Sequence, residues 1–263
     1  MKEEEEKSGL MEDVNIELSF IDPNESYFHA IRYFLINLLD GETFDVGDLA
    51  DIIITQVQVG TLIINEDDTP EDKNVLAFAT LLPFSLYSKR DSMKSIMKYC
   101  IANAAEKLSA TDSKKFQDLL SSKKIALFLN ERLVNLPPDP VPALHKALKD
   151  DRTWALEEDN TSFNVDYILY ITKVAENIPE DGPSLKRHTD EDLIWYKFED
   201  EMLKDEAEYK ILFNSKVGLQ MAGATNPTEY TMKSNIQYKK MILLIPFKKY
   251  VSCIDKFTSL LSA

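Results

Sequence analysis

Segments with the two-residue repeat of a β-strand alternate along the whole chain with segments that have the repeat of a helix. Apolar and polar residues alternate over 14–20, as in a strand with one buried face, whereas apolar residues over 91–109 keep helical spacing. Residues 125–129 are continuously apolar, which is typical of a strand covered on both faces. No Gly/Ser-rich linker or internal repeat interrupts this order. The pattern therefore predicts one α/β domain, a mixed central sheet with helices on both faces.

The expected elements follow the order β-α-α-β-β-α-β-α-β-α-β-β-α, within a single domain at 13–263 that follows a short acidic tail at 1–12. Asp22 and Pro23 supply an N-cap and a first-turn proline for the first helix. Residues 46–56 suit a helix, although Ile52–Ile54 would also suit a strand. The other expected strands are 57–64, 75–82, 125–129, 165–174, 211–214 and 241–245, and the other expected helices are 91–109, a short turn at 116–120, one from Asp139 to near Asp150, 190–210 and 247–261.

The composition predicts a folded protein that carries no membrane segment. The chain has 263 residues, 44% of them apolar, and a chain of this length buries roughly 75% of its unfolded surface. Its two cysteines cannot make a disulfide framework, and Cys100 falls on the apolar stripe of a predicted helix. The first residues do not resemble a signal peptide, and the longest apolar run, Met241–Ile245, is far too short to span a bilayer. We therefore expect a soluble, intracellular protein.

Charge is distributed in blocks of alternating sign. Residues 1–80 carry 19 acidic and 4 basic residues, 81–150 carry 7 and 12, 151–208 carry 17 and 6, and 209–263 carry 2 and 8. The two acidic blocks predict a negative field that attracts basic partners, although acidic loops that only keep the protein soluble would give the same pattern. Direct nucleic-acid binding is disfavoured, because it depends on Lys and Arg contacts to phosphate.

The usual signatures of catalysis are missing from the sequence. None of the three histidines, His29, His145 and His188, has a second His or Cys at metal-ligand spacing, so we interpret them as surface or packing residues. No glycine-rich phosphate loop and no G-x-S-x-G elbow occurs. A general acid and base cannot be chosen from 45 acidic residues without a pocket. We therefore assign no catalytic, cofactor-binding or metal-binding residue.

One segment, Gln220–Thr225, approaches a cofactor loop. It resembles the Q/R-x-x-G-x-G/A loop with which the GNAT acetyltransferases hold the pyrophosphate of coenzyme A, by aiming backbone N–H groups and a helix N-terminus at phosphate oxygens. Here Thr225 stands at the last small position, and Asn226-Pro227 follows without a clear helix. The other interpretation is a flexible connection between two strands.

Four short segments resemble, in order, the motifs of one known family. Residues 129–138 (LNERLVNLPP) with 142–146 (PALHK) resemble the hallmark "ERhhNhP … P-hh" segment of the BCCIP family of eukaryotic nuclear proteins. Residues 19–31 resemble the start of that family, 56–61 (QVQVGT) its "Q-x-x-V-G-T" strand entry, and 244–246 its closing strand. The residues that carry these motifs are Asp22, Pro23, Phe28, His29, Gly60, Thr61, Glu131, Arg132, Asn135 and Pro137.

The resemblance implies a GNAT-like fold, no acetyltransferase activity and no cofactor. Fungal members of the family act as chaperones for a basic large-subunit ribosomal protein, and the family is linked to nuclear export and ribosome assembly. We therefore expect a nuclear, non-enzymatic protein that escorts such a client. In this context Glu131 and Arg132 are expected to form a local ion pair that anchors the proline-rich turn, rather than a catalytic pair.

Acidic clusters would shield the Lys/Arg face of a basic client and would make its binding dependent on salt. The candidate partner-binding residues are Glu66, Asp67, Asp68, Glu157, Glu158, Asp159, Asp190, Glu191, Asp192, Glu199, Asp200 and Glu201. Two other functions remain open. The first is an acetyltransferase that binds acetyl-CoA at 220–225 or where the sheet splays. The second is a nuclear scaffold for DNA-repair or cell-cycle proteins, and nuclear transport proteins are further possible partners.

Overall fold

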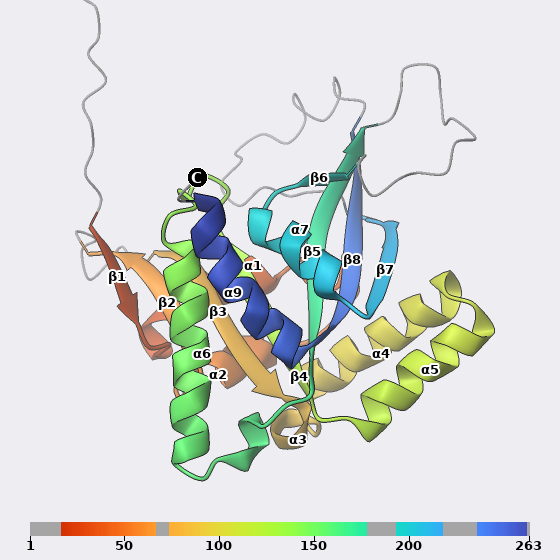
Figure 1. Ribbon diagram of the computed structural model, residues 1–263, viewed down its shortest axis with the longest axis horizontal. Helices are drawn as coiled ribbons and strands as arrows, with labels where there is room; N and C mark the ends of the chain where they lie inside the picture. Colours follow the sequence, from red (N-terminus) through yellow and green to blue (C-terminus); the bar gives the residue numbers. More distant parts are fainter. Residues whose placement is uncertain (1–16, 67–73, 178–192, 218–235, 262–263) are drawn as a thin grey trace, which may run out of the picture.

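A single twisted sheet runs through the centre of the computed structural model, which describes residues 17–66, 74–177, 193–217 and 236–261 (Figure 1). All neighbouring strands are antiparallel except β4 and β5, so the sheet is mixed, as predicted. Across the sheet the order is β1 (Leu18–Ile21), β2 (Gly60–Asn65), β3 (Val75–Pro83), β4 (Ile125–Arg132), β5 (Tyr167–Asn177), β8 (Ile236–Pro246) and β7 (Tyr209–Asn214), and β6 (Leu193–Trp195) pairs with β5.

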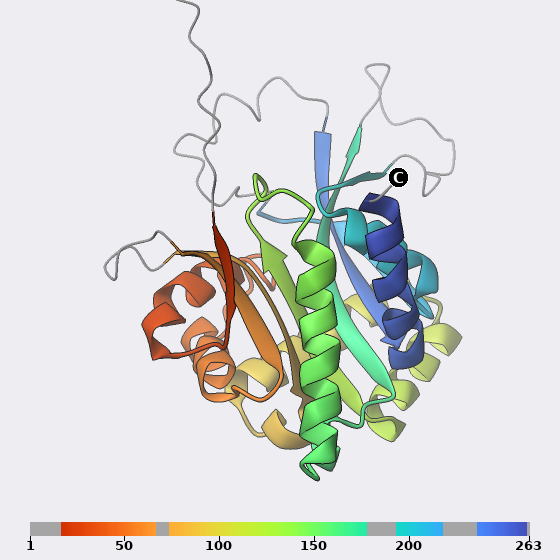
Figure 2. The same ribbon diagram turned by 60° about the vertical axis from the view of Figure 1, so that its left-hand side comes forward.

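Helices cover both faces of this sheet, which confirms the predicted architecture. In Figure 2, α6 and α9 cross in front of the strands, and the red and orange helices lie behind them. One face carries α1 (Phe28–Leu35), α2 (Val46–Thr55), α4 (Asp91–Lys107) and α5 (Ala110–Ser122), and the other carries α6 (Val141–Glu157), α7 (Phe198–Glu206) and α9 (Phe247–Leu261). Short turns complete the fold: η1 (Glu25–Tyr27), α3 (Phe84–Tyr87) and η2 (Thr161–Phe163).

Strand β4 shows why the chain needs two hydrophobic cores. Ile125, Leu127 and Leu129 point into the core under α1, α2, α4 and α5, whereas Ala126 and Phe128 point into the core under α6, α7 and α9. Successive side chains of a strand point to opposite faces, so a continuously apolar strand must be covered twice. The buried thiol of Cys100 lies in the first core, as its place on the helix predicts.

The parallel strands β4 and β5 separate towards their carboxyl ends. They pair from Ile125–Tyr167 to Phe128–Tyr170 and no further, whereas β5 continues to pair with β8 as far as Asn177. The last four residues of β4 pair only with β3. Under the acetyltransferase alternative, acetyl-CoA would bind at this splayed position of the sheet. The similarity to the GNAT fold stays a prediction.

The predicted N-cap of the first helix is wrong. Asp22 does not cap it; instead Asn24 caps the 3-10 turn η1 by accepting a hydrogen bond from the Ser26 N–H at 3.1 Å, and α1 begins only at Phe28. Residues 46–55 form helix α2, so Ile52–Ile54 are helical and not part of a strand. Helix propensity within 23–27 is expressed as a 3-10 turn, a common way for a helix to begin.

Three other helices differ in length from the prediction. The short turn expected at 116–120 is the thirteen-residue helix α5, capped by Ser109. Helix α6 continues past Asp150 to Glu157, because Ala155 is buried and no helix-breaking residue intervenes. The stretch 190–210 contains strand β6 before α7, and its first three residues lie outside the described part of the chain. In the described residues no helix is both long and apolar enough to cross a membrane.

Candidate binding surface

The motif at 56–61 closes a turn at the start of β2. The Gln56 side-chain amide donates to the Val59 carbonyl at 2.9 Å, and its oxygen accepts from the Val59 N–H at 2.9 Å. Thr80 also donates to the Val59 carbonyl, at 2.8 Å. A Cβ atom at Gly60 would lie 2.9 Å from the Thr80 hydroxyl oxygen, so only glycine fits without a shift. The motif is therefore a packing and hydrogen-bonding device.

Helix α6 is fastened to this turn by Asp151. The carboxylate of Asp151 accepts from the Gly60 N–H and from the Thr61 hydroxyl, each at 3.3 Å. Burial raises the pKa of Asp151 to about 6, the two hydrogen bonds partly offset this, and the negative charges of Asp22 and Asp150 add to it. The motif at 56–61 is thus joined to the C-terminal half of α6.

The outer face of that half-helix carries an exposed tryptophan between carboxylates. Trp154 is 53% exposed, and residues three and four positions away on a helix lie beside it. Those positions are Asp150, Glu157 and Glu158, together with Asp151, whose carboxylate is already bound by Gly60 and Thr61. Among the described residues, Glu157 and Glu158 have no ion-pair partner. Acidic groups around an exposed indole form a surface suited to Lys and Arg side chains, by charge and by cation–π contact.

The C-terminus of α6 adds a third uncompensated carboxylate. Asp159 has a φ of 60°, and the N–H groups of Asp159 and Asn160 donate back to the carbonyls of Leu156 and Ala155. This arrangement is a Schellman motif, whose left-handed position normally holds glycine. Negative side chains at a helix C-terminus also oppose the helix dipole. The sequence therefore places three acids where they weaken the helix, which favours a role in binding.

Other predicted partner-binding residues fall into three groups. Glu66, at the end of β2, and Glu201, on α7, are exposed, as the prediction requires. Asp67 and Asp68, and the triplet Asp190, Glu191 and Asp192, lie outside the described residues, as does the segment 220–225. The remaining pair, Glu199 and Asp200, is buried.

The prediction that Glu199 and Asp200 lie on the acidic surface is wrong. Both are 0% exposed, and each faces a cation and hydrogen-bond donors of the sheet. Glu199 pairs with Arg132 at 3.2 Å. Asp200 pairs with Lys197 at 3.4 Å and accepts hydrogen bonds from Tyr170, at 2.7 Å, and from Thr172. A run of acids at a helix N-terminus looks exposed in sequence, but here the first turn of α7 packs against the strands.

Burial and charge act in opposite directions on these two carboxyl groups. Burial pushes the pKa of Glu199 upward, but the positive charges of Arg132 and Lys197 more than offset it, so the pKa is lowered. For Asp200 burial prevails over the attraction of Lys197, and the pKa is raised to about 6. Glu199 is thus held as an anion, and Asp200 takes up a proton at a higher pH than an ordinary aspartate does.

Lys197 fills the opening between β4 and β5. Its ammonium donates to the Asn130 carbonyl and to the Tyr170 hydroxyl, both at 2.6 Å. The Asn130 carbonyl belongs to β4 beyond the last residue that pairs with β5. A backbone acceptor that the splayed strands leave unpaired is therefore satisfied by a side chain of this protein rather than by a ligand.

The expected local ion pair between Glu131 and Arg132 is also wrong. Successive residues of a strand point to opposite faces, so Arg132 reaches Glu199, while Glu131 faces Lys173 at a distance of 3.7 Å. Arg132 still supports the turn that follows, because it donates to the Leu136 carbonyl at 3.2 Å. Asn135 and Pro137 are exposed in that turn.

The remaining motif residues and His145 differ in how far they are buried, and the buried ones serve packing. Pro23 is buried, Phe28 is half-buried, and His29 is exposed with its ring edge against Phe28. His145 is fully buried and shares a hydrogen bond of 3.0 Å with the Tyr250 hydroxyl. Burial lowers the pKa of His145 to about 4, so the ring is neutral at pH 7. The interpretation of His145 as a packing residue is confirmed.

Comparison with known proteins agrees with these motifs. The model of the BCCIP family matches residues 13–203, a range that contains β1, β2, β4, α6 and the first turn of α7. The chain belongs to the BCCIP family. Its membership explains why the three motif segments within 13–203 occur in order, and it is consistent with a non-catalytic role.

Relatives of this BCCIP-family chain occur in plants and fungi. It is 28% identical over 270 residues to the protein BCCIP homolog of Arabidopsis thaliana, covering 98% of this chain and 77% of the relative. It is 26% identical over 255 residues to the protein bcp1 of Schizosaccharomyces pombe, covering 87% and 88%. The crystal structure of BCP1 from Saccharomyces cerevisiae superposes with a TM-score of 0.62 at 22% identity, over 97% of this chain and 93% of that one, and so shares the fold.

Proposed function

We propose that this protein is a non-enzymatic binding protein that acts in the nucleus as a chaperone or escort for a basic large-subunit ribosomal protein, in ribosome biogenesis and nuclear transport. The observation that carries the proposal is the outer face of α6, where Trp154 lies exposed among carboxylates that have no cation partner in the described structure. We call Asp150, Trp154, Glu157, Glu158 and Asp159 the α6 face.

The chemistry of the α6 face fits a client that is rich in Lys and Arg. Each carboxylate offers oxygen acceptors to ammonium and guanidinium groups, and the indole offers the face that cations prefer. A newly made protein with an uncovered rRNA-binding surface needs such groups until RNA replaces them. The net charge of −15 extends the attraction beyond the α6 face and speeds the encounter.

The filled opening between β4 and β5 supports binding over catalysis. Lys197 and the carboxylates of Glu199 and Asp200 take up the position where an acetyl-CoA-dependent enzyme would open its sheet. The acetyltransferase alternative therefore receives no support from the described residues. It predicts stabilisation of the fold by millimolar acetyl-CoA, which a thermal melt detects; our proposal predicts an unchanged melting temperature.

The decisive experiment is co-purification of the tagged protein at low and high salt, with partners identified by mass spectrometry. We expect one basic ribosomal protein in near-equal amount at low salt and its loss as salt rises. The variant Glu157→Lys/Glu158→Lys should lose the client. The matched control Asp118→Lys/Asp255→Lys changes the net charge equally at exposed positions on α5 and α9 and should retain it.

Two outcomes would contradict the proposal. Recovery of DNA-repair or cell-cycle proteins without a ribosomal protein would favour the scaffold alternative. Equal loss of the client in both charge variants would show that only net charge matters and that the α6 face has no special part in recognition.

A further inference from the structure

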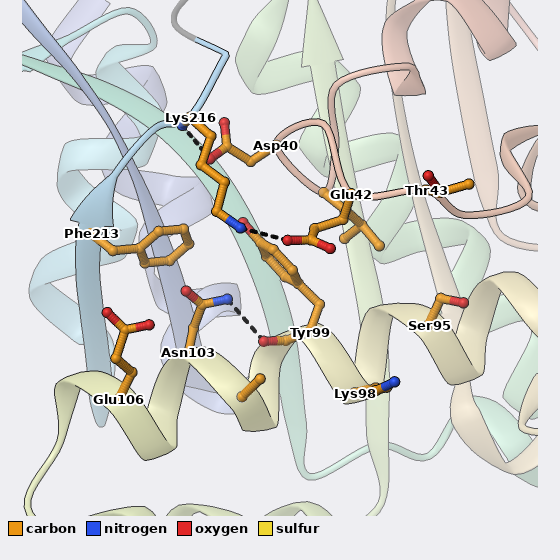
Figure 3. A pocket seen from close by; sticks show the side chains of 12 residues that line it. Asp40, Glu42, Thr43, Ser95, Lys98, Tyr99, Asn103, Glu106, Phe213 and Lys216 are labelled. Atoms are coloured by element: carbon orange, nitrogen blue, oxygen red, sulfur yellow. Dashed lines mark hydrogen bonds and ion pairs between the residues drawn. The ribbon is translucent and has the colours of Figure 1, made fainter.

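A hollow of about 300 Å³ lies on the other side of the sheet from the α6 face (Figure 3). Three segments build it: the connection between α1 and α2, the outer side of α4, and the end of β7. Its volume is at the lower end of the range of small-molecule pockets, so it suits one side chain better than a cofactor. The lining residues that matter here are Glu42, Tyr99, Asn103, Glu106, Phe213 and Lys216.

The connection between α1 and α2 is held firmly in place. Asp40 adopts a φ of 56° and accepts hydrogen bonds from the Ser215 hydroxyl at 2.5 Å and the Lys216 N–H at 2.6 Å. At Gly41 φ is 82°, and a Cβ atom there would lie 2.9 Å from Val217. These contacts fix the wall of the hollow, and they use the carboxylate of Asp40 internally, so the hollow is formed before any ligand arrives.

The hollow is lined by a buried hydroxyl group that lacks a hydrogen-bond partner in the described structure. Tyr99 is 9% exposed, and its hydroxyl makes no hydrogen bond in the described structure. Its ring packs edge-on against Phe213, with the centroids 5.9 Å apart. Buried polar groups in native proteins normally have partners, so this hydroxyl indicates a ligand that would satisfy it.

The other polar groups of the hollow are mostly acceptors. The Asn103 amide nitrogen donates to the Tyr99 carbonyl at 2.9 Å, which leaves the amide oxygen free to accept. Glu106 shares one oxygen with Lys107 at 2.7 Å. In Figure 3 the Asn103 oxygen and the Glu106 carboxylate lie together below Phe213. Acceptors beside an aromatic ring form the surroundings that a guanidinium group prefers.

Lys216 occupies part of this space as a cation of the protein itself. Its side chain is 69% exposed, and its ammonium donates to Glu42 at 2.5 Å. The hydrogen bond to Glu42 raises the pKa of Lys216, with smaller contributions from Asp40 and Glu106, so these carboxylates all act on this position. The other lysine of the lining, Lys98, points away from the remaining side chains in Figure 3.

We propose that this hollow takes up one arginine side chain of a bound protein, which displaces the ammonium group of Lys216. The guanidinium would lie against Phe213, donate to Glu42, Glu106 and the Asn103 oxygen, and bring a donor to the Tyr99 hydroxyl. Arginine fits better than lysine because its five N–H groups reach acceptors on several sides at once. The inference rests on the proposed function, since it requires a basic partner, but it concerns a second contact surface.

The test uses N-acetyl-arginine methylamide as the probe, titrated into the isotope-labelled full chain and followed by NMR. We expect saturable shifts of Tyr99, Asn103 and Phe213, with the lysine analogue binding more weakly. Glu106→Gln should weaken binding of the probe about tenfold, the usual loss for a hydrogen bond to a charged group. Lys216→Met should strengthen it, because the competing cation is gone, and Asp118→Asn, at an exposed position of α5 outside both surfaces, should leave it unchanged.

Two results would overturn the inference: absence of shifts at the hollow, or equal affinity in Lys216→Met and the parent chain. The proposed function can fail separately. If the probe binds as expected but no basic ribosomal protein co-purifies, the proposed arginine site is supported and the proposed client is wrong. If the client binds through the α6 face and the probe leaves the hollow unaffected, only the second contact is wrong.

Discussion

Single residues at the end of α6 combine poor helix chemistry with good binding chemistry. Glu157, Glu158 and Asp159 lie at the negative end of the helix dipole, and Asp159 also adopts a left-handed backbone. Such residues persist when another function compensates for the stability they cost. Stability and client binding should therefore respond in opposite directions to substitutions here.

Replacement of Asp159 by glycine should stabilise the protein and weaken its binding of the client. Relief of the left-handed strain is worth about 1 kcal/mol, which corresponds to roughly 2–4 °C in melting temperature for a chain of this size. Differential scanning calorimetry measures the gain. The control is Glu158→Gly, where φ is −83°: there glycine brings no relief and should lower the melting temperature. A lower melting temperature in Asp159→Gly would contradict the strain argument.

Asp151 should make the stability of the fold depend on pH. Its pKa of about 6 in the folded protein is above the ordinary value of 3.8, so the folded state binds more protons between these values, and the contribution to stability falls as pH rises from about 4 to about 6. Asp151→Asn keeps an oxygen for Gly60 and Thr61 but does not titrate. The melting temperature of the variant minus that of the parent should increase over this range and then stay constant. Parallel curves would show that Asp151 does not titrate as described.

At the scale of elements, α7 is held to the sheet by buried charges instead of an apolar stripe alone. Lys197, Glu199 and Asp200 all contact strand residues that lie tens of positions earlier in the chain. A buried pair contributes little net stability over an apolar replacement, but removal of one partner leaves an uncompensated group. The losses of unfolding free energy on replacing Lys197 and Asp200 should therefore be non-additive.

Lys197→Met should cost about 3–5 kcal/mol of unfolding free energy, and Lys197→Met/Asp200→Asn should cost less than the single change. Urea unfolding at pH 8 measures both. As a control, Lys249→Met removes an exposed pair with Glu206, which is worth at most about 1 kcal/mol. If the double variant lost the sum of the two single losses, Lys197 and Asp200 would not be coupled.

The same pair shows where sequence reasoning stops. Periodicity predicted the helices α4 and α9 and the strands on which both cores depend, because those patterns reflect local geometry, whereas it left α2 open between a helix and a strand. It missed the length of α5 and the position of Glu199 and Asp200, because a polar helix face gives the same pattern whether it meets water or buried cations. Lys197, three residues before Asp200, was the one local signal of a pairing.

For the whole molecule, the excess of negative charge acts at a distance. Attraction between a chain of net charge −15 and a basic client extends over the Debye length, about 10 Å at 0.1 M salt and 3 Å at 1 M. The two proposed contacts, the α6 face and the hollow beside α4, lie on opposite sides of the sheet. A client that uses both must therefore wrap around an edge of the molecule.

The association rate with the client should fall at least about tenfold between roughly 50 mM and 500 mM salt, while the dissociation rate changes less. Stopped-flow mixing of the protein with its purified client measures both rates. The Asp118→Lys/Asp255→Lys variant should slow association without losing the complex. An association rate that does not depend on salt would show that the charge serves solubility alone.

The sequence by itself determined the mixed α/β architecture, the family and the acidic character, because hydrophobic periodicity, ordered motifs and charge counts are properties of neighbouring residues. Only the tertiary structure decided which acids meet a partner. It buried Glu199 and Asp200 against Arg132 and Lys197, and it left Trp154, Glu157, Glu158 and Asp159 in solvent at the C-terminal end of α6. The reason is that exposure depends on how distant segments pack, and identical carboxylates in similar acidic runs carry no local sign of it.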